Sequence, residues 1–189
     1  LLSLILDNTI GNVTSIQASF GFDIGKINPD SRLFNIHLAG GSILDVGVYP
    51  VSFSRLIAGI VSGKSFLNPY KIEGTAMIGK TGVDEIAHAT LFFDNKIIAQ
   101  VSTAIRKNMN NSAIIKGSKG SIKLSNPWIY DKETGSYESF ITIDVEGKQE
   151  TIDMKRPEHI FSFEAEVASR SIIEKRTEPF PPAMTWDDT

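Results

Sequence analysis

The chain has 189 residues, a net charge of −3 at neutral pH, 41% hydrophobic residues and 22% charged residues. These values are those of one ordinary globular domain, and the slightly acidic, mixed charge offers no electrostatic basis for binding nucleic acid or an anionic membrane. Cysteine is absent, which excludes disulfides and thiolate chemistry. The lack of cysteine suits a reducing cytoplasm, which is the location we expect unless an export signal lies upstream.

The first third of the chain is predicted to contain the end of a helix, a strand, a loop and a long helix. Residues 1–6 are apolar like the end of a helix, and residues 13–22 alternate small and large side chains as a strand does. The loop over residues 23–37 carries Arg32 towards residues 40–61, which are apolar enough for a helix buried on most sides. Polar residues interrupt each apolar run before the roughly 18 residues of a membrane-spanning helix.

Two polar side chains, Asp45 and Tyr49, lie four residues apart within residues 40–61. In a helix this spacing puts them on one face, about a turn apart. Gly47 and Pro50 are expected to weaken the helix around them. Because burying a carboxylate or a phenol without a partner is costly, both groups need partners. From the residues alone two interpretations stay open: a core helix with satisfied polar groups, or a reactive pair.

A long β region follows, and a second helix is predicted from Pro157 to about Lys175. Turn residues such as Asp94, Asn95 and Gly147 separate the strands by short links, which join antiparallel neighbours, so a meander is expected. The predicted strands are residues 70–79, 85–93, 96–106, 112–116, 120–124, 140–145 and 149–154. The fold class is therefore α+β, a largely antiparallel open sheet with helices packed on one face.

Several kinds of chemistry lack a signature in this chain. No Gly-x-Gly-x-x-Gly loop follows a strand, so no dinucleotide site is predicted, and His37, His88 and His159 lack the spacing of metal ligands. Trp128 and Tyr130 could stack on a sugar ring, although packing in a core or interface is the commoner role. A basic cluster is more typical of a solvated sheet edge than of a phosphate site; it comprises Arg106, Lys107, Lys116, Lys119 and Lys123.

The segment GGSILDVGVYPVSFSRLI, which contains Asp45 and Tyr49, resembles the GGGxLLDxGxYxxxxxR segment of the glucose–fructose oxidoreductase/inositol dehydrogenase superfamily (Gfo/Idh/MocA). Further segments match in the family's order: IGNVTSIQASFGFD, NPDSRLFNIHLAGG, IIKGSKGSIKL and PPAMTWDDT. At the position of Tyr49 the inositol dehydrogenase branch has His, whereas the dihydrodiol and aldose dehydrogenase-like branch has Tyr. The chain therefore most resembles the Tyr-type branch.

The resemblance implies that residues 1–189 form a single substrate-binding and oligomerisation domain, folded like the C-terminal domain of glyceraldehyde-3-phosphate dehydrogenase. It implies an N-terminal Rossmann domain outside this chain, with a catalytic Lys and most of the site for NAD or NADP, and no metal. The chain alone is then expected to be inactive. Both ends are expected to be truncated, because the first residues are apolar without a Met, and Thr185 with Asp188 is typical of a capping box with no helix after it.

By motif position, the resemblance assigns Asp45 to the substrate hydroxyls or the catalytic network, and Tyr49 to the acid–base position. In this reaction a hydride passes from a carbinol carbon to a nicotinamide while a base takes the hydroxyl proton. A free phenol titrates near about pH 10, so a tyrosine base needs a nearby cation, and the family's Lys could supply that charge or itself be the base. Arg32, Asn35 and Gly41 match the substrate-binding region, and Arg32 could equally brace its loop.

The function implied by the resemblance is that of an NAD(P)-dependent oxidoreductase acting on the CH–OH group of a sugar, a polyol or a cyclic vicinal diol. Apolar residues occur on both faces of the predicted strand 85–93, and the family uses its open sheet face for subunit contacts, so a homodimer or tetramer is expected. The alternative is a family member without catalysis that serves as a ligand-binding or regulatory module. Absence of the catalytic Lys from the upstream domain of the same polypeptide would favour that alternative.

Overall fold

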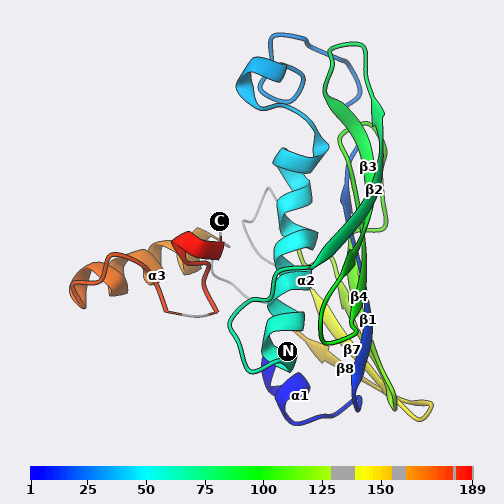
Figure 1. The fold of residues 1–189 in the computed structure, drawn as a ribbon, viewed down its shortest axis with the longest axis vertical. Coiled ribbons are helices and arrows are strands. Elements are labelled where there is room, and N and C mark those ends of the chain that lie inside the picture. Colours follow the sequence, from blue (N-terminus) through cyan, green and yellow to red (C-terminus); the bar gives the residue numbers. More distant parts are fainter. Residues whose placement is uncertain (129–138, 155–160, 181, 189) are drawn as a thin grey trace.

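The computed structural model describes residues 1–128, 139–154, 161–180 and 182–188, and consists of an open sheet with helix α2 lying along one face (Figure 1). The helices are α1 (Leu2–Leu6), α2 (Val48–Val61) and α3 (Phe161–Ile173). Short 3-10 turns form at Ile36–Leu38 and Trp186–Asp188, and a π-helical turn, Ile43–Gly47, directly precedes α2. The strands are β1 (Val13–Gly21), β2 (Lys71–Ile78), β3 (Asp84–Phe92), β4 (Ile98–Ala104), β5 (Ser112–Gly117), β6 (Gly120–Ser125), β7 (Phe140–Val145) and β8 (Lys148–Asp153).

The sheet is largely antiparallel, as the sequence predicts, but its strand order is not a single meander. Over the described residues the order is β2-β3-β4-β1-β5-β6-β7-β8, and β1 pairs parallel with β4 and antiparallel with β5. The expected meander is therefore wrong at one place, because β4 and β5 follow each other in the chain but are separated by β1. Short turns identify hairpins between sequence neighbours and carry no information on where an earlier strand inserts.

The face of the sheet that lies towards α2 carries the hydrophobic core. Ile16 of β1 is fully buried there, and its direct neighbours in the ladders are Ala99 of β4 and Ile115 of β5. Helix α2 places Ile57 and Ala58 against this surface, and both are also fully buried. Successive strand residues alternate between faces, and no described helix covers the opposite face of the sheet in Figure 1.

The C-terminal end of α2 is fixed to the turn between β3 and β4. In that turn, Asn95 donates from Nδ2 to the carbonyl oxygen of Ala58 and to Ser62 Oγ, each at 2.9 Å. The chain beyond the helix passes close to Gly59, where an added Cβ would lie 2.6 Å from the Cα of Phe66. A hydrogen-bonded side chain and a close backbone contact therefore hold this end of the helix.

The stretch Ile36–Val61, which includes α2, is long and apolar enough to cross a membrane by length and composition alone. The expectation that polar residues interrupt every such run is wrong for this stretch, because Asp45 and Arg55 are too few to offset its many aliphatic residues. Length and apolar composition are weak evidence for a membrane span, since the core helix of a soluble domain can have the same length and composition. In Figure 1 the helix lies along the sheet.

Helix α3 projects away from the sheet in Figure 1, and none of its residues is buried. The predicted packing of helices on one sheet face holds for α2, whereas the apolar positions Phe163, Val167 and Ile172 of α3 are exposed. Periodicity shows which side chains share a helix face but not what covers that face. The predicted start of this helix at Pro157 lies outside the described residues.

We expect the substitution Ile16→Ala to lower the free energy of unfolding by about 2 to 5 kcal/mol, because it leaves a cavity at the centre of the core. The matched control is Gln17→Ala, which removes an exposed side chain on the opposite face that donates to Gln100 at 3.1 Å. The control should cost less than about 1 kcal/mol. Urea unfolding followed by tryptophan fluorescence measures both changes, and equal losses would contradict the assignment of the two faces.

Candidate active site

The loop that precedes the π-helical turn is folded tightly on itself by backbone hydrogen bonds. The N–H of Gly41 donates to the carbonyl of Leu33 at 2.9 Å, and the N–H of Gly40 donates to that of Asn35 at 3.0 Å. A Cβ on Gly40 would lie 2.7 Å from the Leu33 oxygen, so this fold of the loop leaves no room for a side chain there. The Asn35 side chain accepts from the N–H of His37 at 2.9 Å and so caps the short turn that follows.

The helical segment begins at Ser42, whose side chain is fully buried. At the start of β3, Asp84 accepts hydrogen bonds from Ser42 Oγ at 2.7 Å and from the N–H of Ile43 at 2.8 Å. On β4, Thr103 donates from Oγ1 to the carbonyl of Ser42 at 2.9 Å. Gly41 has a φ of +117°, and a Cβ there would collide with the Asp84 carboxylate. The two neighbouring strands thus hold the first helical residues, and sequence reasoning missed Asp84 as their main partner.

The π-helical turn Ile43–Gly47 stands where the sequence predicts a weakened helix. It contains Asp45, and α2 begins directly after it. Pro50, the third residue of α2, is buried, and its carbonyl accepts from Ser54 Oγ at 2.7 Å. A proline so close to the start of the regular helix removes a donor where the hydrogen-bond pattern is already irregular. Such π-helical turns are frequent at functional sites.

Asp45 forms an ion pair with Arg32, which reaches over from the preceding loop and donates from Nη1 to Oδ1 of the carboxylate. The Asp45 side chain is only 12% exposed, whereas that of Arg32 is 73% exposed. The need of Asp45 for a partner is thus met, and of the two roles open to Arg32 the structure shows the bracing contact. Its role in substrate binding stays a prediction, as do those of Asn35 and Gly41.

Tyr49 lies in a cluster of aromatic rings. Its ring centroid is 5.4 Å from that of Phe20 on β1, in an edge-on contact, and 6.3 Å from that of Trp128. Trp128 is half-buried, packs edge-on against Phe53 at 5.7 Å, and donates from Nε1 to the carbonyl of Ser19 at 2.9 Å. The Tyr49 ring is therefore held in place while 47% of the residue stays exposed. Tyr130 lies outside the described residues.

The outward face of this helical segment is apolar and exposed next to Tyr49. Leu44 and Val48 are 58% and 47% exposed. The prediction of a helix buried on most sides is therefore wrong at its N-terminal end. The reason is geometric: the sheet covers one side of the helix, and no described segment covers the other side at this end.

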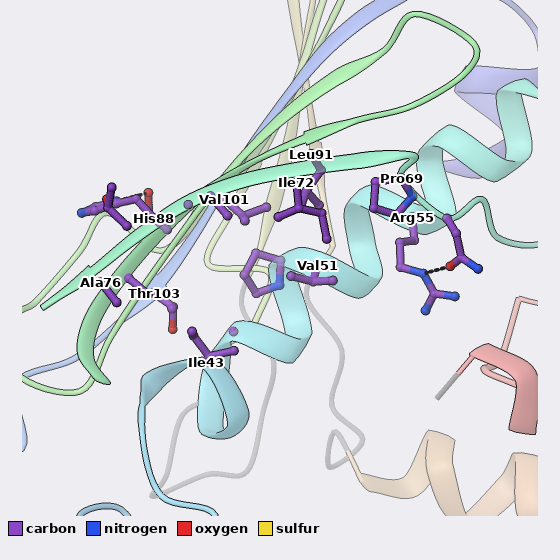
Figure 2. Close-up of a pocket in the computed structure, with 18 residues that line it drawn as sticks. Ile43, Val51, Arg55, Pro69, Ile72, Ala76, His88, Leu91, Val101 and Thr103 are labelled. Carbon is purple, nitrogen blue, oxygen red and sulfur yellow. Dashed lines mark hydrogen bonds between the residues drawn. The ribbon is translucent and has the colours of Figure 1, made fainter. Parts of the chain in front are cut away.

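A cavity of about 500 Å³ lies between α2 and the β2–β4 part of the sheet (Figure 2). Its walls are almost wholly apolar, and at one end Arg55 donates from Nε to Asn68 Oδ1 at 3.0 Å. None of the predicted site residues lines it. Its main lining residues are Ile43, Gly47, Pro50, Val51, Ile72, Ala76, Ala87, Leu91, Val101 and Thr103. Because Arg55, Asn68 and Thr103 at its wall are hydrogen-bonded within the protein, this cavity is a poor candidate for the reaction site.

Among the residues that the structure describes, no group of three or more His, Cys, Asp or Glu side chains is placed to hold a metal ion. His88 lies in β3, where its Nδ1 is 2.8 Å from Ser102 Oγ on β4. His37 is in the 3-10 turn before the helix. His159 lies outside the described residues.

The open sheet, and the helix that starts at a Gly–Gly loop and lies along one of its faces, define an α+β domain with the fold found in the C-terminal domains of known oxidoreductases. The structure is similar to that of the aldose-aldose oxidoreductase from Caulobacter crescentus, with a TM-score of 0.77 and 22% identity, over 99% of this chain and 52% of that protein. The chain belongs to the GFO/IDH/MocA C-terminal domain family, whose model matches residues 1–123.

Relatives of this chain include trans-1,2-dihydrobenzene-1,2-diol dehydrogenases. The Mus musculus enzyme is 30% identical over 128 residues, which are 68% of this chain and 36% of the relative. The Xenopus tropicalis enzyme is 31% identical over 153 residues, which are 80% of this chain and 41% of the relative. The chain thus spans about two fifths or less of these relatives. KijD10, a 3-ketoreductase from Actinomadura kijaniata, has a TM-score of 0.73 and 17% identity over 92% of this chain and 50% of that protein.

We expect the substitution Gly41→Ala to lower the free energy of unfolding by about 3 kcal/mol or more, because a methyl group there meets the Asp84 carboxylate on a backbone with positive φ. The matched control is Gly25→Ala, at a φ of +77° with open space around it. The control should lose only the backbone contribution, roughly 1 to 2 kcal/mol. Thermal unfolding measures both variants, and equal losses would contradict the close contact between Gly41 and Asp84.

Proposed function

We propose that this chain is the substrate-binding domain of an NAD(P)-dependent oxidoreductase that acts on the CH–OH group of a sugar, a polyol or a cyclic vicinal diol. The observation that carries the proposal is the half-exposed Tyr49, one helical turn from Asp45, which Arg32 holds by an ion pair. The names of the relatives support it, since they are dihydrodiol dehydrogenases, and the similar structures include an aldose-aldose oxidoreductase and an NADP-bound 3-ketoreductase.

The roles of the residues follow from their surroundings. The chemistry that a nicotinamide would supply when bound is acceptance or donation of a hydride. Tyr49, whose ring is fixed by Phe20 and Trp128, exchanges a proton with the substrate hydroxyl, alone or together with a lysine from the other domain. Asp45 accepts a hydrogen bond from a neighbouring substrate hydroxyl, because Arg32 holds its carboxylate while leaving it partly exposed.

The cofactor would be held mainly by an N-terminal Rossmann domain. The described residues offer no phosphate-binding glycine loop, whereas an apolar surface lies beside Tyr49. Leu44 and Val48 form that surface, and exposed aliphatic groups of this kind fit contact with a flat nicotinamide ring or with the domain that carries it. The rings of Phe20 and Trp128 next to Tyr49 favour a cyclic substrate, since aromatic faces pack well against ring C–H groups.

The test of the proposal is the change in NAD(P)H absorbance when the complete polypeptide is given a panel of aldoses, polyols and vicinal diols. Turnover with one class supports the proposal and identifies the substrate. Tight cofactor binding without turnover would indicate a substrate outside the panel. Absence of both cofactor binding and turnover would contradict the dehydrogenase proposal and favour a ligand-binding or regulatory module.

We expect the substitution Tyr49→Phe in the complete enzyme to lower kcat by about 100-fold to 10,000-fold, because it removes the proton-exchanging hydroxyl and keeps the ring that packs on Phe20 and Trp128. The control is Tyr70→Phe, which removes an exposed hydroxyl at the start of β2. Initial-rate kinetics on the best substrate measure both variants. Turnover of Tyr49→Phe within a few-fold of the unsubstituted enzyme would refute the acid–base role.

We also propose that the open face of the sheet joins two copies of the chain in a homodimer or tetramer. Support comes from the apolar side chains Phe92, Ile98 and Ile114, which alternate with the buried positions of their strands and so lie on the open face. Ile98 is 42% exposed within one chain.

We therefore expect sedimentation velocity at micromolar concentration to give a dimer or larger species. The substitution Ser102→Arg, which puts a bulky charge on the open face, should shift the protein towards monomer. The control Ser65→Arg, after α2, should leave the assembly unchanged. A monomeric profile for the unsubstituted protein would argue against this interface.

A further inference from the structure

The carboxylate of Asp84 is the main acceptor for the start of the helical segment that carries the proposed reactive pair. It accepts from Ser42 Oγ and from the N–H of Ile43, and it fills the space that a side chain on Gly41 would need. The first N–H groups of a helix have no partner within the helix, so a side chain that binds them decides where the helix begins. Asp84 lies far along the chain, at the start of β3, which is part of the rigid sheet.

We propose that Asp84 is a positioning residue for Asp45 and Tyr49, acting through Ser42 and Ile43. The inference rests on the proposed function, because it assigns how the same site is held in its working geometry. Asp84 touches neither of the two reactive residues in the described contacts. Its effect passes through the hydrogen-bond pattern of the π-helical turn.

The physical basis is the extra residue that a π-helical turn contains. In such a turn the hydrogen bonds span one residue more than in an α-helix. If Ile43–Gly47 relaxed to an α-helix, with its 3.6 residues per turn, the residues of the turn would rotate about the axis relative to α2, by an amount that grows with each residue before α2. Asp45 would then leave its pairing direction with Arg32, while Tyr49 stayed with Phe20 and Trp128.

Two strands oppose that relaxation from one side. Asp84 on β3 fixes the donor groups of Ser42 and Ile43, and Thr103 on β4 fixes the carbonyl of Ser42. A single residue is thereby held through its hydroxyl, its carbonyl and the N–H that follows it. Removing the Asp84 carboxylate frees the hydroxyl and the N–H together, so the π-helical and α-helical patterns come closer in energy.

The chain contains its own matched control at the other end of the same helix. Asn95 comes from the turn between β3 and β4, and it also makes two hydrogen bonds to the helical segment, to the Ala58 carbonyl and to Ser62 Oγ. The substitution Asn95→Ala therefore loosens α2 without touching the turn that holds Asp45. Substitution of either Asp84 or Asn95 should lower the free energy of unfolding. Only substitution of Asp84 should also change the relative positions of Asp45 and Tyr49.

The experiment compares Asp84→Ala, Asp84→Asn and Asn95→Ala in the complete polypeptide. Amide hydrogen exchange over residues 42–47 should speed up in both Asp84 variants and stay unchanged in Asn95→Ala. We expect kcat to fall about 10-fold to 100-fold in Asp84→Ala with the KM for the cofactor unchanged, because small displacements of reacting groups have effects of this size. Asp84→Asn keeps one acceptor oxygen and should give an intermediate kcat, and Asn95→Ala should stay within twofold.

The outcomes separate this inference from the proposed function. If the unsubstituted enzyme turns over no substrate, the proposed function fails, and the exchange rates still test whether Asp84 holds the turn. If the enzyme is active and Asp84→Ala retains kcat within twofold, or if exchange over residues 42–47 does not change, the positioning role is refuted. Should Asp84→Ala fail to fold, the same criteria apply to Asp84→Asn.

Discussion

The start of the central helix needs partners for the buried Ser42 and for the N–H groups that have no acceptor within the helix, and the arrangement of the molecule depends on how that need is met. The N–H of Ile43 binds a carboxylate from β3, and Ser42 is wholly enclosed between β3 and β4. Because these acceptors come from the sheet, the helix direction is set by the sheet and not by the helix's own propensity. The candidate site is therefore held by strands, which are more rigid than loops.

Three distant parts of the chain meet at this helix start. The Gly–Gly loop brings Arg32 back over Asp45, the insertion of β1 beside β4 brings Phe20 against Tyr49, and the end of β6 leads to Trp128. Each contact joins residues that are close in space but separated in the sequence. The surroundings of Asp45 and Tyr49 are therefore formed by the whole sheet, while the helical segment that carries the two residues supplies only their spacing.

Much of the fold could be predicted from the sequence because its signals are local. Turn residues placed the strands within about two residues of their observed ends, and Gly47 with Pro50 marked the irregular turn. The need of Asp45 for a partner was also predictable, because a shielded carboxylate requires one. Asp84 was not predictable, since an acidic residue at a strand start is ordinary by itself and gains its role only from Ser42, 42 residues earlier.

The parallel pairing of β1 with β4 also has a consequence for how the chain folds. Gln17 and Gln100 face each other across this pair although 83 residues separate them, whereas β2–β3–β4 and, in the other group, the hairpins β5–β6 and β7–β8 close through short turns. Closing a long loop has a high entropic cost that arises before any stabilising contact forms. The group β2–β4 and the group β5–β8 should therefore form first, and β1 should insert between them last. During synthesis, β1 leaves the ribosome long before either of its neighbours exists. Its edges then stay unpaired for that interval, which makes this central strand the segment most in need of protection from aggregation.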